Sequence, residues 1–327
     1  MQARTSKQSW LVSALAAVAL ASMVTAFFLP VWWVSLTAPN YPPDAFPDGI
    51  RIHFQFNGVT NGCTTAPATS RVAQETQQEE LGWRTEGGAE PKAAPGGSKE
   101  AVLDCVHEMN TINHYVGMHP IGFGAPVEIL MSKFIIGMLA VMLLGFAIPG
   151  VKARVLVLGL GFGAVAVWMG VDLFVVGSLD QAVKVFIEES GKYFRESEKI
   201  AHWADNVRVA TYAVLAFMLA VMAFSTWASA RWTRFQLALA AIPAFLPVFF
   251  VGAYAAWLYY FGHSLHPWGA FTVKPFMPTV FGDGKVAQFT THSYPHLGFA
   301  FLAVSALALL VAIARRRLEL LDAPTEA

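Results

Sequence analysis

Long apolar runs separated by short polar segments dominate the pattern along this chain. A hydrocarbon core about 30 Å thick requires roughly 20 mainly apolar residues per helix, and six runs of about that length contain few charges. They cover residues 10–36, 128–148, 155–179, 209–228, 235–260 and 297–314. We therefore expect a mainly α fold, a polytopic membrane helix bundle with six spans.

Basic residues between these runs predict the orientation, because short cytoplasmic loops retain Lys and Arg. The basic clusters are Arg4 and Lys7, Lys152 and Arg154, Arg231 and Arg234, and Arg315 to Arg317. Counting six spans from a cytoplasmic N-terminus places every cluster inside. Both termini are then cytoplasmic, with residues 315–327 forming a cytoplasmic tail.

The first apolar run, within residues 1–36, has two interpretations. A cleaved secretory signal peptide is one, because Val24-Thr25-Ala26 resembles a small-residue cleavage site. However, the apolar stretch continues through Trp32 and Trp33, which is longer than a signal core, and Trp pairs suit a membrane interface. We favour an uncleaved N-terminal membrane anchor in the bacterial inner (cytoplasmic) membrane, with the main soluble domain on the periplasmic side.

This topology leaves three outside segments around a five-span bundle at residues 128–314: a domain at 37–127, a connector at 180–208 and a loop at 262–296. Residues 50–57 alternate apolar and polar, which predicts a strand and hence a small extracytoplasmic β-containing domain between spans 1 and 2. Residues 66–99 have the composition of a disordered insertion. The connector is amphipathic in places, which favours a helix along the membrane surface.

Composition narrows the function classes. The chain is 55% hydrophobic and 13% charged, as expected for a protein in a bilayer. Its net charge is zero, so it lacks the excess of positive charge that is typical of nucleic-acid-binding proteins. The sequence contains no phosphate loop, haem attachment motif, nucleophile elbow or His-Glu-x-x-His motif, so catalysis is not indicated. No histidine lies near the middle of a span, so we do not expect haem, although His263 and His296 could hold one near the outer surface.

Cys63 and Cys105 are the only cysteines. In an oxidising compartment a disulfide is the simplest interpretation. Thiolate metal ligands are the alternative, because sequence separation does not report the distance between the two Cα atoms.

All nine histidines lie in outside segments or at span ends. The densest group, at 105–119, combines His107, His114, Met118 and His119, and imidazole with thioether is typical of copper sites. If the stretch is helical, His107, His114 and Met118 share one face. Gly117 and Pro120 predict that the helix ends near Met118, which frees His119 to turn toward the membrane. The alternative is that the methionines pack and the histidines form a polar surface.

A second group joins the last two predicted spans and consists of His263, His266, His292 and His296. His263 and His266 share one face of a helix end, and His292 and His296 share another if the start of the last span is helical. Four imidazoles would then meet, covered by the Pro-punctuated loop 274–278. The alternative is that these histidines bind nothing and lie at a membrane interface because an amphipathic ring is favourable there.

Two ionisable residues, Lys133 and Asp172, fall within apolar spans at matching depth. Such charges are costly and usually paired or functional. We predict an ion pair between neighbouring antiparallel helices; a proton or ion relay is the alternative.

Three short motifs carry a resemblance to a known family. They are Asn113-His114-Tyr115-Val116-Gly117-Met118, Phe261-Gly262-His263 and Lys274-Pro275-Phe276-Met277-Pro278. They resemble a poorly characterised family of bacterial six-span membrane proteins associated with copper and nitrous oxide reductase accessory systems. The resemblance covers the chain outside the 66–99 insertion and singles out His114, Met118 and His263. It does not place the two cysteines.

We therefore expect an integral membrane protein that binds copper at its extracytoplasmic face and serves copper handling or assembly of a respiratory copper enzyme. Its expected partners are membrane lipid and a copper-containing respiratory or oxygenase complex. The alternative is a non-catalytic membrane subunit of a larger redox or oxygenase complex. A transporter is a third possibility, but the chain shows no evident inverted repeat or broken helix pair. The exception is the fifth span, where Pro243 and Pro247 predict a kink.

Overall fold

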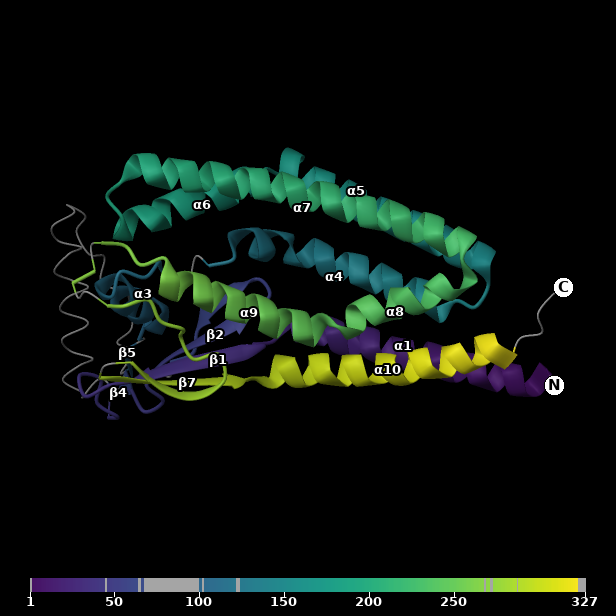
Figure 1. Ribbon diagram of the computed structural model, residues 1–327, viewed down its shortest axis with the longest axis horizontal. Coiled ribbons are helices and arrows are strands. Elements are labelled where there is room, and N and C mark those ends of the chain that lie inside the picture. The colour runs from purple at the N-terminus through teal and green to yellow at the C-terminus, as the bar shows by residue number, and fades with distance from the viewer. Residues whose placement is uncertain are drawn as a thin grey trace.

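The computed structural model describes residues 2–44, 46–63, 66–67, 100–101, 103–121, 124–267, 269–270, 273–286 and 288–322. It is mainly helical, with a small antiparallel sheet at one end of an elongated bundle (Figure 1). The start of the first helix and the end of the last lie at the opposite end. The predicted disordered insertion 66–99 lies almost entirely outside the described residues.

The helices follow most of the predicted apolar runs. Their bounds are α1 Gln2–Phe28, α3 Cys105–Tyr115, α4 Pro126–Ala147, α5 Val151–Gly170, the π-helix η2 Val171–Val175, α6 Ser178–Tyr193, α7 Ser197–Arg231, the 3₁₀ helix η3 Thr233–Phe235, α8 Gln236–Ala244, α9 Leu246–His263 and α10 Leu297–Asp322. In the described part of the chain, α1, α4, α5 with η2, α7 and α10 are the five helices long and apolar enough to cross a membrane. Several long apolar helices indicate a multi-pass membrane protein.

The predicted fifth span is broken rather than continuous. Its two helices, α8 and α9, are bent by 46° where they meet at Phe245. Pro243 lies within α8 and Pro247 at the start of α9, so the bend occurs where prolines remove backbone donors and clash with the preceding turn. The proline kink is therefore confirmed.

The first predicted run, 10–36, is not one helix. α1 ends at Phe28, and β1 occupies Trp32–Thr37. Pro30 stands between them and cannot donate the hydrogen bond that would continue the helix. The assignment of Trp32 and Trp33 to a membrane helix was wrong: both are strand residues.

The sheet is ordered β3-β2-β1-β7-β6, and every neighbouring pair is antiparallel. Its strands are β1, β2 Ile50–Gln55, β3 Gly58–Asn61, β6 Gly282–Val286 and β7 Phe289–Pro295; a separate pair joins β4 Ala66–Pro67 to β5 Glu100–Ala101. The strand predicted at 50–57 is confirmed as β2. Because β1 follows α1 and β7 precedes α10, the packed pair α1 and α10 continues directly into the pair β1 and β7 (Figure 1).

One face of the sheet packs on α9 and holds it in place. Trp32 is buried in this layer and packs its ring against Tyr254 at 5.8 Å and Phe299 at 5.5 Å. Its indole N–H donates to Ser293 Oγ at 2.9 Å across the sheet. These contacts hold α9, whose last residue is His263, against the sheet.

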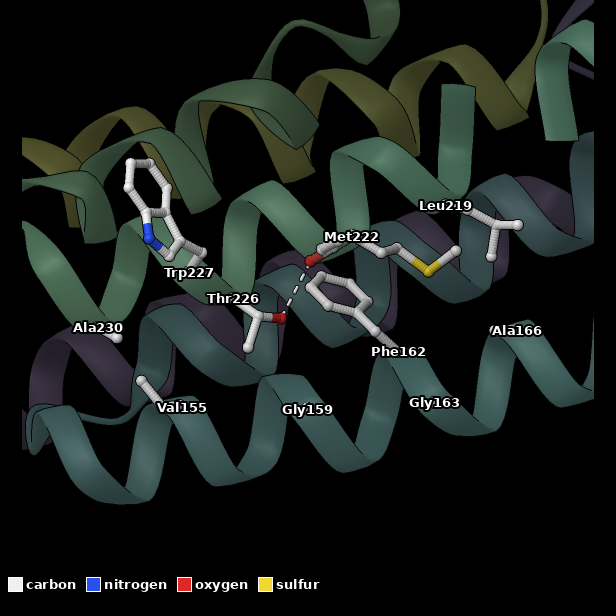
Figure 2. Close-up of a pocket in the computed structure, with 11 residues that line it drawn as sticks. Val155, Gly159, Phe162, Gly163, Ala166, Leu219, Met222, Thr226, Trp227 and Ala230 are labelled. Atoms are coloured by element: carbon white, nitrogen blue, oxygen red, sulfur yellow. Dashed lines mark hydrogen bonds between the residues drawn. The ribbon is translucent and has the colours of Figure 1, made fainter. Parts of the chain in front are cut away.

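Two further helices extend the bundle toward the sheet end. With 35 residues, α7 is about 52 Å long, which exceeds a bilayer core. The amphipathic connector predicted at 180–208 forms α6 and the first turns of α7, and α6 packs along α7 (Figure 1). The helix is confirmed, and its position at a membrane surface stays a prediction. Beyond α6, α7 packs beside α5 (Figure 2).

Candidate functional site

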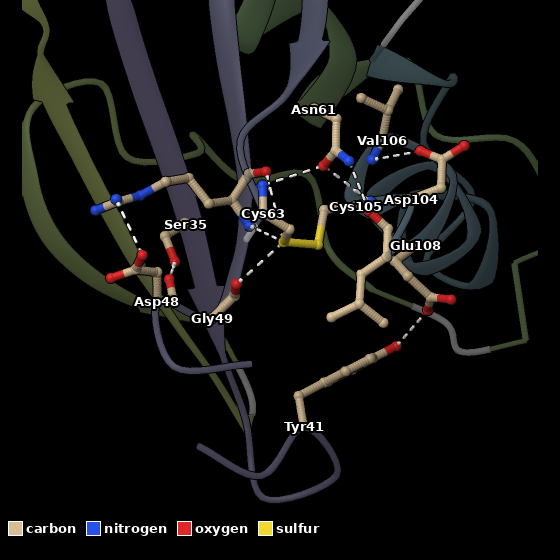
Figure 3. The surroundings of a disulfide bond; sticks show 12 residues. Ser35, Tyr41, Asp48, Gly49, Asn61, Cys63, Asp104, Cys105, Val106 and Glu108 are labelled. Carbon is tan, nitrogen blue, oxygen red and sulfur yellow. Dashed lines mark hydrogen bonds and ion pairs between the residues drawn. A yellow bond between two sulfur atoms is a disulfide. The ribbon is translucent and has the colours of Figure 1, made fainter. Parts of the chain in front are cut away.

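A disulfide fixes α3 to the sheet at the end of the bundle (Figure 3). It joins Cys63, just after β3, to Cys105, the first residue of α3, with Cα atoms 6.0 Å apart. Asn61 supports it by accepting the backbone N–H groups of both cysteines, at 3.1 and 3.3 Å. The predicted disulfide is confirmed, and a thiolate role in metal binding is excluded for this state.

The α3 helix begins and ends as its local chemistry requires. Asp104 caps its start by accepting the backbone N–H groups of Val106 and His107. It ends at Tyr115, and Gly117 then adopts φ +80, a conformation that favours glycine. The predicted helix end near Met118 is confirmed. Because Met118 lies beyond the helix and is buried in the core, the predicted shared face of His107, His114 and Met118 is wrong.

The turn after α3 brings the two histidine groups together. Gly117 O accepts the backbone N–H of His266 at 2.7 Å, and Tyr115 O accepts that of Ala270 at 2.7 Å. A Cβ at Gly117 would lie 2.5 Å from His266 O, so only glycine allows this approach. The backbone of the loop after α9 therefore docks directly on the turn that precedes His119.

His119 and His266 share a largely aromatic environment. The His119 ring lies 5.0 Å from both Phe194 and Trp203, and the His266 ring lies 5.5 Å from the same Phe194. His266 Nε2 lies 3.0 Å from Glu196 Oε2, as expected for a ring N–H that donates to the carboxylate. We call these five residues the His119–His266 centre.

Electrostatics keep one imidazole of this centre neutral. Burial, and to a lesser extent the neighbouring His266, lowers the pKa of His119 to about 4. The pKa of Glu196 is also lowered, first by its hydrogen bond from Lys199 and then by that from His266. His119 therefore presents an unprotonated ring at neutral pH.

The other predicted site residues lie in separate surroundings. His107 Nδ1 is 3.5 Å from Tyr193 Oη, and the His114 ring is 6.0 Å from the same tyrosine ring. His263 stacks on Tyr259 with ring centroids 3.9 Å apart. Two members of the first group thus share Tyr193, while His263 projects from the end of α9.

The predicted convergence of four imidazoles in the second group does not occur. His292 is a strand residue of β7 and bonds Asp283 Oδ1 at 2.7 Å, and α10 begins only at Leu297. His292 and His296 therefore share no helical face. His296 instead packs against His53, a β2 residue that the sequence did not single out, with ring centroids 5.0 Å apart.

Lys133 and Asp172 form the predicted ion pair. Lys133 Nζ lies 2.6 Å from Asp172 Oδ2, and the same carboxylate oxygen accepts the Ser178 hydroxyl at 2.5 Å. The pair joins α4 to η2. The π-helical turn at Val171–Val175 thus carries a carboxylate with two partners from different helices.

Within the described residues, no three His, Cys, Asp or Glu side chains lie close enough to hold a metal ion. No protein-family model, curated protein or solved structure gives a significant match to this chain. The fold itself defines the class: a mainly helical, multi-pass membrane protein with a small antiparallel sheet at one end, beside which two histidine-bearing segments meet.

Replacing His119 by Phe should remove a pH dependence of stability. The folded pKa of about 4 lies below the unfolded value of about 6.5, so the contribution of neutral His119 is complete above pH 6.5 and is lost as the pH falls toward 4. Between pH 7 and pH 4.5 the wild type should lose about 2 kcal/mol relative to His119→Phe. Thermal unfolding in detergent at the two pH values measures this difference, with the exposed His202→Phe as control. Equal losses in both variants would contradict the buried, neutral assignment.

Proposed function

We propose that this chain is a six-span protein of the bacterial inner membrane, with both termini cytoplasmic and the sheet end outside. In this arrangement α8 and α9 together make one bent span. Two features support the orientation: the disulfide lies at the sheet end, and disulfides persist in oxidising compartments. Exposed basic residues such as Lys152 and Arg231 lie toward the other end, as cytoplasmic loops require.

Labelling of introduced cysteines tests the orientation. In spheroplasts, a membrane-impermeant maleimide should react with His202→Cys, at the start of α7, and reach Thr233→Cys only after lysis. Both positions are exposed. The reverse pattern would invert the topology.

We further propose that the His119–His266 centre binds copper. The observation that carries this proposal is the meeting of a neutral imidazole with a second imidazole oriented by a carboxylate. Metal ligation requires unprotonated imidazole, which His119 supplies. A carboxylate that accepts one ring N–H fixes the tautomer and raises ligand basicity, which Glu196 does for His266.

The donor set favours monovalent copper. Structural zinc sites take four ligands, whereas no group of three His, Cys, Asp or Glu side chains placed to hold one metal ion occurs among the described residues. Cu(I) accepts fewer ligands, and imidazole suits copper. Phe194 and Trp203 flank the rings and limit water around them. When bound, the metal would supply a transferable Cu(I) ion, and these residues would hold and shield it.

The resemblance to copper accessory systems supports a role for the bound copper. The protein would hold copper at the outer face for delivery to, or assembly of, a respiratory copper enzyme. Catalysis is not part of the proposal. The histidines outside the centre, including His107, His114 and His263, would then be accessory positions around it.

A Cu(I) titration against a chromophoric chelator tests the centre. Wild type should bind about one Cu(I) per chain, and His119→Phe and His266→Phe should each weaken binding at least about tenfold by removing one of two ligands. His202→Phe is the matched control, because His202 is an exposed histidine of α7 and is not one of the five residues of the centre. Unchanged affinity in both ring variants would remove the centre from the proposal.

A non-catalytic docking subunit is the second candidate, and one observation favours it. Met277 and Phe281, at the sheet end, expose 45% and 66% of their surface in a segment outside the candidate spans. Such side chains suit a protein partner. If copper binding fails while a redox or oxygenase complex co-purifies, this becomes the leading function.

A further inference from the structure

An apolar groove of about 540 Å³ runs between α5 and α7 (Figure 2). Its lining residues recur at helical spacing on each helix and include Gly159, Phe162 and Gly163 on α5, and Met222, Thr226 and Trp227 on α7. The only hydroxyl among them, on Thr226, already donates to Met222 O at 3.0 Å. Apart from this hydroxyl and the indole N–H of Trp227, the side chains that line the groove offer a hydrocarbon surface.

Two glycines form the floor of this groove. A Cβ at Gly159 or Gly163 would meet no atom within 4 Å, whereas a Cβ at Gly161 would lie 2.7 Å from Val141 of α4. Gly161 therefore serves the packing of α4 against α5. Gly159 and Gly163 instead keep open a channel that faces outward along the bundle.

One end of the groove is basic. Val155 and Ala230 lie together at this end (Figure 2). Lys152 precedes Val155 by one turn, Arg231 follows Ala230 directly, and Arg234 lies in η3; all three basic side chains are exposed. None of them takes part in the ion pairs found among the described residues. The groove is thus apolar along its length and has exposed positive charge at one end.

We propose that this groove binds one anionic diacyl phospholipid, with an acyl chain along Gly159 and Gly163 and the phosphate headgroup at Lys152 and Arg231. Basic pockets between membrane helices recognise anionic headgroups in this way. Trp227, 55% exposed in the groove wall, suits the headgroup boundary. A second copy of the chain is a poorer occupant, because two-fold packing through this face would bring the two basic ends together. The site lies toward the end of α5 and α7 opposite the His119–His266 centre and is independent of it.

Native mass spectrometry of delipidated protein with dioleoyl phosphatidylglycerol or dioleoyl phosphatidylcholine tests the site. Wild type should retain one phosphatidylglycerol preferentially. Lys152→Gln and Arg231→Gln should each weaken its binding roughly fivefold. Gly163→Leu, which fills the floor, should abolish retention of both lipids.

Two matched controls separate this site from general surface effects. Arg317→Gln removes an exposed basic residue of α10 away from the groove, and Gly170→Leu fills open space at the other end of α5. Both should bind like wild type. Equal retention of the two lipids, equal loss in the controls, or a shift from dimer to monomer on Gly163→Leu would overturn the proposal, the last by assigning the groove to a second copy.

Discussion

Replacing Cys63 and Cys105 by serine is expected to lower the free energy of unfolding by about 4 kcal/mol. The disulfide closes a loop with a sequence separation of 42. Closing a loop of that length reduces the conformational entropy of the unfolded chain, which stabilises the folded state by about this amount. Thermal or denaturant unfolding in detergent measures the loss. A dithiothreitol-treated wild type should match the double variant.

The serine variant also provides its own control, because dithiothreitol should not change its stability. The loss should extend to α3, since the disulfide joins Cys63 to Cys105, the first residue of that helix, and Asn61 of β3 accepts the backbone N–H of the same residue. Proteolysis between 103 and 121 should therefore accelerate. An unchanged midpoint in the reduced wild type would show that the sheet end does not depend on this bond.

Removing Lys133 alone should destabilise the protein by about 2 kcal/mol, below the range for fully buried pairs, because the side chains of Lys133 and Asp172 remain 33% and 18% exposed. Lys133→Met leaves the Asp172 carboxylate with Ser178 as its remaining polar partner. The double variant Lys133→Met/Asp172→Leu should recover most of the loss, because no unpaired charge then remains.

The comparison of single and double variants distinguishes the pair from a relay. A structural pair gives strongly non-additive stabilities in a double-mutant cycle. Additive effects would mean that the two side chains do not support each other. A proton or ion relay would instead appear as a loss of transport in proteoliposomes with stability unchanged.

The sequence predicted the features that depend on local composition. Span-length apolar runs predicted the long helices, Gly117 and Pro120 predicted the end of α3, and the prolines of α8 and α9 predicted the bend. The ion pair followed from matching depth in two neighbouring spans. In each case a single segment, or two adjacent ones, carried the whole signal.

The features that the sequence missed depend on contacts between distant segments. The inward-facing residues of β7 include Thr291 and Ser293, both buried, so the strand lacks the apolar alternation that reveals β2. The apolar run around Trp32 predicts a membrane helix, yet Trp32 lies in β1, which pairs with β2 and β7.

The candidate site was only half visible in the sequence. His119 and His266 were both singled out as ligands, but their meeting depends on the docking of the His266 backbone on Gly117. Phe194, Glu196 and Trp203 carried no signal, because an aromatic or acidic residue near a helix end is commonplace. Only the turn between α6 and α7 brings them to the two imidazoles.

The most direct test of copper binding at the His119–His266 centre is the metal content of the protein as purified. Mass spectrometry and an absorption spectrum should be recorded on wild type and on His119→Phe/His266→Phe, both expressed with copper. We expect about one copper per wild-type chain, no haem band, and a fall to background in the double variant. Equal copper in the two proteins, or none in the wild type after copper loading, would contradict the account.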